Sequence, residues 1–246
     1  MKRIHLVMPM AGGGTRFTKD GVAIPKPLIE LQEKPFFYWA TQSINKFVDV
    51  MDITFVVLKE HVEKYRIDER IKSFYPDAVI VVIPEVLKGA VLTCCEGIRY
   101  MEDENPILFN DCDHAFISKT FYTFVKKAEF DAVDGALLTF KSDSPDYSYV
   151  VFDEEKNIIG TVEKVVASDE AICGAYYFKN KTVFEKAVET YLINCQYAEY
   201  YISGVYGEML KHKAKLCTFP IDDHISFGTP EEYRLVKQEE RLMNLL

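Results

Sequence analysis

A run of three glycines, with an arginine and a lysine close behind it, is the first feature of the sequence that suggests chemistry. Without Cβ atoms, the backbone N–H groups of such a run can converge on an anion. The arginine adds a forked positive charge, and the lysine stands between two prolines that restrict the chain around it. We therefore predict a triphosphate site, with a flexible turn as the alternative. The residues concerned are Ala11, Gly12, Gly13, Gly14, Arg16 and Lys26.

Two aspartates follow another apolar run. Asp111 and Asp113 come after Ile-Leu-Phe-Asn, and in extended geometry residues two apart point to the same side. Mg²⁺ prefers oxygen ligands and binds one or two carboxylates together with substrate phosphates. The pair therefore predicts a Mg²⁺ site, with Asp113 as the first choice of ligand. The alternative is an Asp-rich turn before a helix that begins at Ser118, and His114 is expected to bond within that loop.

The elements that must position these residues alternate along the first half of the chain. Strands are predicted at 3–8, 53–58, 78–83 and 107–110, and helices at 35–47, 61–74, 89–101 and 118–128. This alternation is typical of an α/β fold with a mostly parallel central sheet flanked by helices. Ligands bind beyond the carboxyl ends of such strands, and the glycine run and the aspartates both lie there.

The second half of the chain has a different pattern. Strand-like segments at 133–140, 148–152, 158–163 and 171–178 have short polar connections, which predicts added antiparallel strands. Helices are predicted at 181–195, 203–213 and 230–246, and a late strand at 215–220. No linker or repeat interrupts the sequence, so we predict one domain, residues 1–246.

Composition restricts the partners. The chain has 246 residues and a net charge of −9, which disfavours nucleic acid as a partner. No apolar run is long enough to span a membrane, and six scattered cysteines are typical of reduced thiols in the cytoplasm. A homo-oligomer is compatible with the sequence, with an apolar contact patch at Phe36, Phe37, Tyr38 and Trp39.

Taken together, the motifs resemble the nucleotidyltransferase superfamily with a GT-A-like, Rossmann-like fold. This superfamily includes the sugar-1-phosphate nucleotidyltransferases and the cytidylyltransferases for small phosphorylated molecules. The similar segments occur in order along nearly the whole chain. They are M-P-M-A-G-G-G-T-R-F, P-K-P-L-I-E-L, L-K-G-A at 87–90, Asp113, V-E-K at 162–164, G-A-Y-Y at 174–177 and F-G-T-P-E at 227–231.

The resemblance implies a role for each matching residue. Gly12, Gly13 and Arg16 would hold the β- and γ-phosphates of a nucleoside triphosphate, and Lys26 the α-phosphate. Gly89 would let the backbone read the base, and Asp113 would hold Mg²⁺. On the acceptor side, Lys164 would bind the phosphate of a phosphorylated small molecule, Glu163 would anchor Lys164 or contact the acceptor, and Gly174 would belong to the Gly-x-Tyr strand. The residues involved are Gly12, Gly13, Arg16, Lys26, Gly89, Asp113, Glu163, Lys164 and Gly174.

One position departs from the family pattern. Many members carry a second metal-binding aspartate where this chain has Ser226, and Asp222 and Asp223 lie nearby but out of register. Either one of these two shifts into the site, or Asp111 compensates, or a single carboxylate suffices.

The expected reaction transfers NMP from an NTP to the acceptor and releases pyrophosphate. Two other classes stay open. The first is a glycosyltransferase that uses Asp111 and Asp113 as an Asp-x-Asp metal motif, although the glycine loop and Lys26 suit a triphosphate better. The second is a non-catalytic nucleotide-binding relative, which Ser226 alone suggests. The nucleotide base and the acceptor cannot be identified from these residues.

Overall fold

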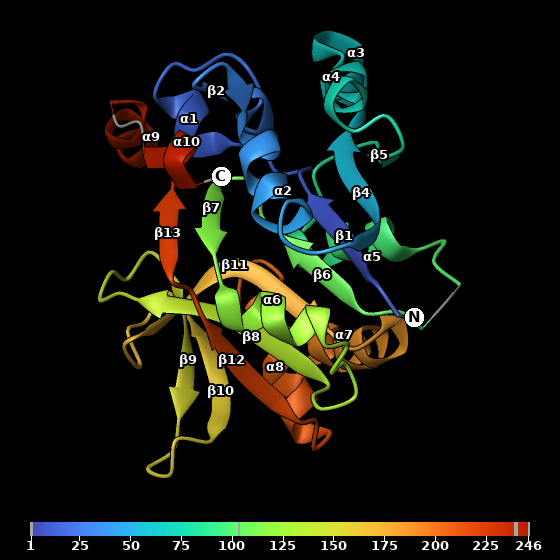
Figure 1. Cartoon of the computed structure of the whole chain (residues 1–246), viewed down its shortest axis with the longest axis vertical. Coiled ribbons are helices and arrows are strands. Elements are labelled where there is room, and N and C mark those ends of the chain that lie inside the picture. Colours follow the sequence, from blue (N-terminus) through green and yellow to red (C-terminus); the bar gives the residue numbers. More distant parts are fainter. Residues whose placement is uncertain (1, 103, 239–240, 246) are drawn as a thin grey trace.

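The structure is a computed structural model that describes residues 2–102, 104–238 and 241–245 (Figure 1). Its strands are β1 (Ile4–Pro9), β2 (Glu30–Leu31), β3 (Lys34–Pro35), β4 (Val50–Leu58), β5 (Val79–Ile83), β6 (Ile107–Asn110), β7 (His114–Ile117), β8 (Gly135–Lys141), β9 (Ser148–Phe152), β10 (Ile158–Glu163), β11 (Glu170–Phe178), β12 (Leu216–Pro220) and β13 (Asp223–Ser226). Its helices are α1 (Thr15–Lys19), the 3₁₀ turn η1 (Lys26–Leu28), α2 (Phe36–Asn45), α3 (Lys59–Tyr65), α4 (Ile67–Phe74), α5 (Ala90–Ile98), α6 (Lys119–Lys126), α7 (Lys181–Asn194), α8 (Ile202–Lys211), α9 (Pro230–Lys237) and α10 (Arg241–Leu245).

The first half of the chain builds the parallel part of the sheet. Strands β6, β1, β4 and β5 are neighbours in that order and run parallel, as the alternating pattern predicts. The chain goes from β1 to β4 and β5 on one side, then returns to β6 on the other side of β1. In open α/β sheets, ligands bind where the strand order reverses in this way, beyond the carboxyl ends of the strands, which here are those of β1 and β6.

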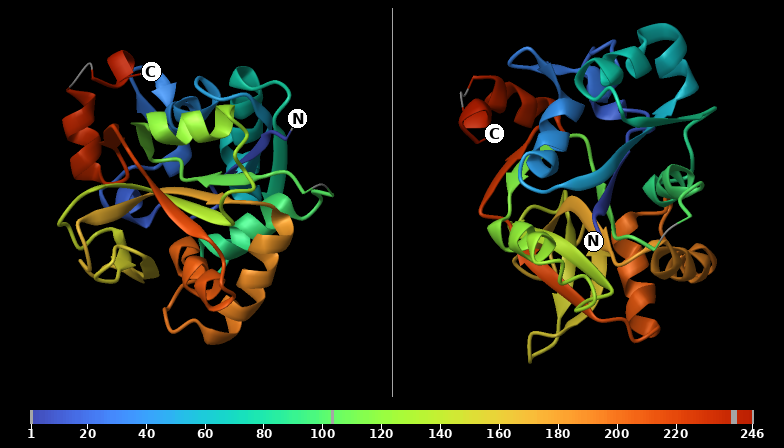
Figure 2. Two further views of the ribbon diagram at one scale, coloured as in Figure 1. Left: turned by 60° about the horizontal axis from the view of Figure 1, so that its bottom comes forward. Right: turned by 45° about the vertical axis from the view of Figure 1, so that its right-hand side comes forward.

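Both faces of the sheet are covered by helices. Leu6 and Met8 of β1 point into one core with α2 and α6, whereas Val7 points into a second core with α5, α7 and α8. This alternation follows from the two-residue period of a strand. The left panel of Figure 2 shows α6 on one side of the sheet and α7 and α8 on the other. The α/β fold class predicted from the sequence is therefore confirmed.

The second half adds the antiparallel strands. Strand β11 pairs with β6, β8 and β9 in antiparallel orientation, and β9 forms a hairpin with β10. Figure 1 shows this hairpin at the lower left of the molecule. Strand β12 then pairs with β8 in parallel orientation. The nine-stranded sheet thus takes strands from both halves of the chain.

A third, smaller core joins the glycine loop to the C-terminal helices. Phe17 of α1 packs against Phe36, with ring centroids 5.8 Å apart, and Phe36 packs against Phe227 at 4.7 Å. Val236 of α9 and Leu242 of α10 complete the cluster.

The apolar contact patch predicted at Phe36, Phe37, Tyr38 and Trp39 is not on the surface, so this prediction is wrong. Phe36 and Phe37 are fully buried, Trp39 is nearly so and Tyr38 is half-buried.

Several boundaries also differ from the prediction. The charged segment 61–74 forms two helices because Arg66 takes a left-handed conformation, with a φ of 52°, and ends α3. Short strands β7 and β13 form a separate antiparallel ribbon that was not predicted. The predicted helix 230–246 contains α9 and α10, while its residues 239, 240 and 246 lie outside the described residues.

Candidate active site

The loop after β1 is open and lies beside Lys26. Gly12 and Gly13 are exposed, and Gly14 takes a left-handed φ of 57° just before α1 begins. A Cβ atom built on Gly14 would lie 3.4 Å from the Cβ of Lys26, so the loop and the lysine are in direct proximity. The exposed glycine loop therefore lies next to Lys26, and the charge of Arg16 acts on Asp113.

Lys26 and Asp113 form an ion pair between the two strand ends. The Lys26 Nζ donates to Asp113 Oδ2 at 2.7 Å, and both side chains are mostly buried. Burial acts to lower the pKa of Lys26, but Asp113 holds this pKa above its usual value. Burial acts to raise the pKa of Asp113, but Lys26 outweighs it and the pKa falls to about 2. Both groups are therefore charged at neutral pH.

Asp111 faces the same site in a different electrostatic environment. Its N–H donates to the carbonyl oxygen of Gly174 on β11, at 2.9 Å. Burial, helped by the charge of Asp113, raises the pKa of Asp111 to about 7. Gly174 has a φ of 90°, and an added Cβ there would lie 2.7 Å from Asp111 Oδ2. Only glycine lets β11 approach the aspartate this closely, which gives Gly174 a steric role.

The segment after β13 lies against Asp113. The N–H of Phe227 donates to the Asp113 carbonyl oxygen at 2.9 Å, and a Cβ on Gly228 would lie 2.5 Å from Asp113 Oδ2. Ser226 pairs with His114 across the β7–β13 ribbon. His114 begins β7, and burial lowers its pKa to about 4, so its ring is neutral.

Asp222 and Asp223 do not replace the missing aspartate at position 226. Asp222 accepts a hydrogen bond from the Lys119 N–H at the start of α6, at 2.8 Å. Asp223 is paired with Arg241 of α10. Both carboxylates therefore have structural partners away from Asp113. Of the three possibilities raised by the sequence, two remain. Either Asp111 is the second metal ligand, or Asp113 is the single protein carboxylate that binds the metal.

The Glu163–Lys164 pair lies at the end of β10. The Glu163 carboxylate accepts hydrogen bonds from the Ser148 hydroxyl, at 2.7 Å, and from the Ser203 hydroxyl. Burial raises the pKa of Glu163, which opposes the effect of these two donors. Lys164 is exposed in a left-handed conformation, with a φ of 54°. The charge of Glu163 also contributes to the raised pKa of Asp111, so Glu163 lies close enough to influence the aspartates electrostatically.

Gly89 forms the loop between β5 and α5. Its φ of 128° and ψ of 164° are in a region that only glycine adopts readily. A Cβ there would lie 2.4 Å from the backbone nitrogen of Tyr200. The loop therefore packs tightly against the segment before α8, a contact between residues more than a hundred positions apart that no local pattern predicts.

The structure thus brings Gly14, Lys26, Asp111 and Asp113 together, with Glu163 near enough to influence Asp111. The site residues predicted from the sequence do not include Ser148 and Ser203, whose hydroxyls donate to the Glu163 carboxylate. Nothing in their local sequence marks them, because each lies on a different element from Glu163. Within the described residues, no three His, Cys, Asp or Glu side chains gather closely enough to hold a metal ion by themselves.

A family model for nucleotidyl transferases matches residues 6–239 of the chain. The chain belongs to this nucleotidyl transferase family. A family match of this extent confirms the enzyme class that the ordered motifs predicted. It also favours nucleotidyl transfer over the glycosyltransferase alternative.

Individual relatives of this nucleotidyl transferase agree with the family match. The chain is 26% identical over 239 residues to D-glycero-alpha-D-manno-heptose 1-phosphate guanylyltransferase of Campylobacter jejuni, covering 94% of this chain and 97% of the relative. Its fold is shared with a nucleoside-diphosphate-sugar pyrophosphorylase from Vibrio cholerae RC9, with a TM-score of 0.83 and 21% identity. The match covers 95% of this chain and 100% of the pyrophosphorylase. The fold is also shared with the inositol-1-phosphate CTP transferase from T. maritima, with a TM-score of 0.74 and 16% identity. This match covers 99% of this chain and 95% of the transferase.

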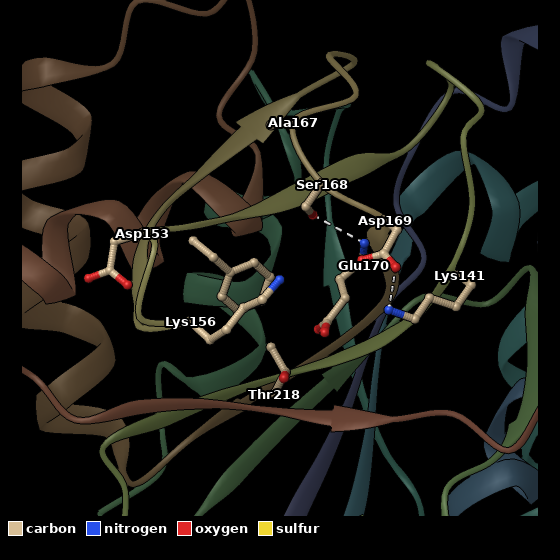
Figure 3. A pocket seen from close by; sticks show the side chains of 9 residues that line it. Lys141, Asp153, Lys156, Ala167, Ser168, Asp169, Glu170 and Thr218 are labelled. Carbon is tan, nitrogen blue, oxygen red and sulfur yellow. Dashed lines mark hydrogen bonds and ion pairs between the residues drawn. The ribbon is translucent and has the colours of Figure 1, made fainter.

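A cavity of about 690 Å³ lies elsewhere, beside the β9–β10 hairpin (Figure 3). Lys141 and Asp169 on its wall are paired with each other at 2.7 Å. None of its lining residues belongs to the glycine loop, to Asp111 and Asp113 or to the Glu163–Lys164 pair.

Among the described helices, none is long and apolar enough to cross a lipid bilayer. All six cysteines are free thiols.

Proposed function

We propose that the protein transfers NMP from a nucleoside triphosphate to a phosphorylated small molecule and releases pyrophosphate, using the residues described above. The observation that carries this proposal is the Lys26–Asp113 pair, which lies beside the glycine loop near the carboxyl ends of the neighbouring strands β1 and β6. A buried, fully charged ammonium beside free backbone N–H groups suits a polyphosphate. The family and the relatives support the same reaction class.

The reaction is an in-line displacement. A phosphate oxygen of the acceptor attacks the α-phosphorus, and the bond from that phosphorus to the bridging oxygen breaks, so that pyrophosphate leaves. Because the attacking oxygen is already anionic, no general base is required. The protein therefore contributes by positioning two polyanions and by stabilising the charge that moves to the leaving group.

The roles of the chain follow from where its charges lie. The glycine loop with Ala11, Gly12, Gly13 and Gly14 binds the phosphates through N–H groups, assisted by Arg16. Lys26 moves from its partner Asp113 onto the α-phosphate and the leaving group. Lys164 binds the acceptor phosphate, and Glu163 fixes the position of that loop. Gly89 lets the backbone of its loop approach the base.

The family generally depends on a divalent metal ion, and the donor set here fits Mg²⁺. Asp113 and Asp111 supply two carboxylates, and Mg²⁺ commonly combines such a pair with phosphate oxygens and water. When bound, the ion would neutralise charge on the triphosphate. With Ser226 in place of an aspartate and Asp222 and Asp223 engaged elsewhere, Asp113 is the main ligand and Asp111 the second.

The same observations also bear on the domain organisation, the cellular location and the class of acceptor. A nine-stranded sheet that takes strands from both halves of the chain supports a single domain over residues 1–246. Free thiols are consistent with a reducing cytoplasm. The relatives named above suggest an acceptor that is a sugar or polyol phosphate.

A matrix of substrates tests the proposal. ATP, GTP, CTP and UTP are each incubated with Mg²⁺ and a panel of sugar 1-phosphates, inositol phosphate and phosphocholine, and pyrophosphate release is measured. We expect release that depends on both substrates for at least one pair. Absence of acceptor-dependent pyrophosphate across the whole panel, with transfer from a nucleotide sugar instead, would overturn it.

A further inference from the structure

A tyrosine-rich segment connects the two sides of the site. Residues 197–201, Tyr-Ala-Glu-Tyr-Tyr, lie between α7 and α8 and are called the tyrosine segment below. Tyr200 contacts the Gly89 loop, whereas Tyr197 and Tyr201, at the two ends of the segment, contact Glu163 and Lys164. Neither the family motifs nor the reaction described above assigns any role to it.

The contact with the Gly89 loop is made by backbone groups. The Tyr200 N–H donates to the Lys88 carbonyl oxygen at 3.0 Å, and the Val91 N–H donates to the Tyr200 carbonyl oxygen at 3.1 Å. The Lys88 ammonium lies 4.9 Å from the centre of the Tyr200 ring. These two hydrogen bonds, together with the close approach of Gly89 to the Tyr200 backbone, join the loop to the segment.

The contact with the acceptor side is made by side chains. The Tyr197 hydroxyl accepts a hydrogen bond from the Glu163 N–H at 3.3 Å. The Lys164 ammonium lies 5.8 Å from the centre of the Tyr201 ring, within the range of a cation–π contact. The rings of Tyr197 and Tyr201 pack edge to face, with centroids 5.7 Å apart. Immediately beyond the segment, Ser203 donates to the Glu163 carboxylate.

We propose that the tyrosine segment couples the nucleotide and acceptor sites, and that Tyr201 is a positioning residue for Lys164. A nucleotide that orders the Gly89 loop also orders the segment, which then holds Lys164 where the acceptor phosphate binds. Each substrate therefore strengthens the binding of the other, because coupling between two sites is reciprocal. This inference rests on the proposed function and identifies how its acceptor site is organised.

Two substitutions at one position test the role of the ring. Tyr201→Phe keeps the aromatic face toward Lys164, whereas Tyr201→Leu removes it at similar size. We expect Tyr201→Leu to raise the KM for the acceptor about two- to fivefold, the range of one exposed cation–π contact, with little change in the KM for the triphosphate. Tyr201→Phe should restore the wild-type KM. Tyr100→Leu, a substitution at a tyrosine that is 82% exposed elsewhere, is the matched control.

A binding experiment tests the coupling without turnover. The affinity of the preferred acceptor is measured by calorimetry with and without a non-hydrolysable analogue of the preferred triphosphate. We expect the analogue to tighten acceptor binding in the wild type and to do so less in Tyr201→Leu and in Tyr197→Phe. Thermal midpoints of all variants show whether they fold.

The outcomes separate the two claims. If the wild type releases no acceptor-dependent pyrophosphate, the proposed function fails, and the coupling fails with it. If the wild type is active and Tyr201→Leu matches the wild type in acceptor KM and in coupling, the proposed function stands and the role of the tyrosine segment is refuted. Equal losses in Tyr201→Leu and Tyr201→Phe would also refute the role of the aromatic face.

Discussion

The two sides of the site are built in different ways. On the nucleotide side, the key groups are backbone N–H groups and a mostly buried ion pair, Lys26–Asp113, at the ends of central strands. On the acceptor side, Lys164 is exposed on a loop after an edge strand, with its ammonium near the Tyr201 ring, while hydroxyl groups from other elements bond the neighbouring Glu163. Buried charges fixed by a sheet are hard to move, while exposed side chains on edge loops are replaced easily. The comparison suggests that triphosphate chemistry is fixed by the fold, and that acceptor choice is set by the more adaptable loops.

The largest expected effect on the nucleotide side comes from removing the carboxylate that pairs with Lys26. Asp113→Asn should reduce pyrophosphate release to background, because it removes both the proposed main metal ligand and the partner of a buried ammonium. The wild type should lose activity in EDTA and regain it with Mg²⁺. Asp77→Asn, at an exposed aspartate away from the site, serves as the control. Wild-type activity that persists in EDTA would contradict the metal assignment.

Lys26→Ala should lower turnover by about 10²- to 10³-fold, the scale of losing one charge-stabilising donor at the reacting centre. The measurement is kcat from continuous detection of pyrophosphate at saturating substrates. Lys186→Ala, at an exposed lysine of α7, should retain full activity. A kcat near that of the wild type in Lys26→Ala would show that the nucleotide side does not depend on this ammonium.

Lys164→Ala tests the acceptor side of the comparison. It should raise the KM for the acceptor about ten- to a hundredfold, the range for one hydrogen bond to a charged group, with a smaller change in kcat. Lys156 is an exposed lysine of the same hairpin region and also has a positive φ, of 66° against 54° for Lys164, so Lys156→Ala is the matched control. If Lys164→Ala lowered kcat as much as Lys26→Ala, the division between the two sides would be wrong.

Gly89→Ala should have the smallest effect on chemistry and a measurable effect on folding. It forces a side chain into a conformation that only glycine tolerates and against Tyr200, so the free energy of unfolding should fall by about 1–3 kcal/mol. Urea denaturation measures this change, and the KM for the triphosphate should also rise. Gly207→Ala in α8, where an added Cβ meets no atom within 4 Å, should be neutral or stabilising by up to about 1 kcal/mol. Equal stabilities of the two variants would exclude a tight Gly89 loop.

Sequence reasoning correctly placed the strands whose own residues carry a clear apolar pattern. The apolar runs of β1 and β6 predicted the two strand ends, and the glycine loop and aspartates followed directly from them. Asp111, Cys112 and Asp113 show why this worked: the two aspartates face the site while Cys112 between them is buried in the core.

The failures have a common cause, which is pairing between distant residues. The β7–β13 ribbon joins four-residue strands about a hundred positions apart, too short to show a period. The aromatic run at Phe36 looked like a surface patch because its partners, Phe17 and Phe227, come from opposite ends of the chain. For the same reason, the contacts of Glu163 with Ser148 and Ser203 could only be found in three dimensions.

The small core around Phe36 has a consequence for biosynthesis. Phe17, in the helix after the glycine run, packs against Tyr233 of α9 and shares its cluster with Phe227, Val236 and Leu242. While a ribosome is still translating the middle of the chain, those partners do not yet exist. The nascent loop therefore lacks the side chains that fix it, and nucleotide recognition should emerge late in translation, after most of the sheet has already been made.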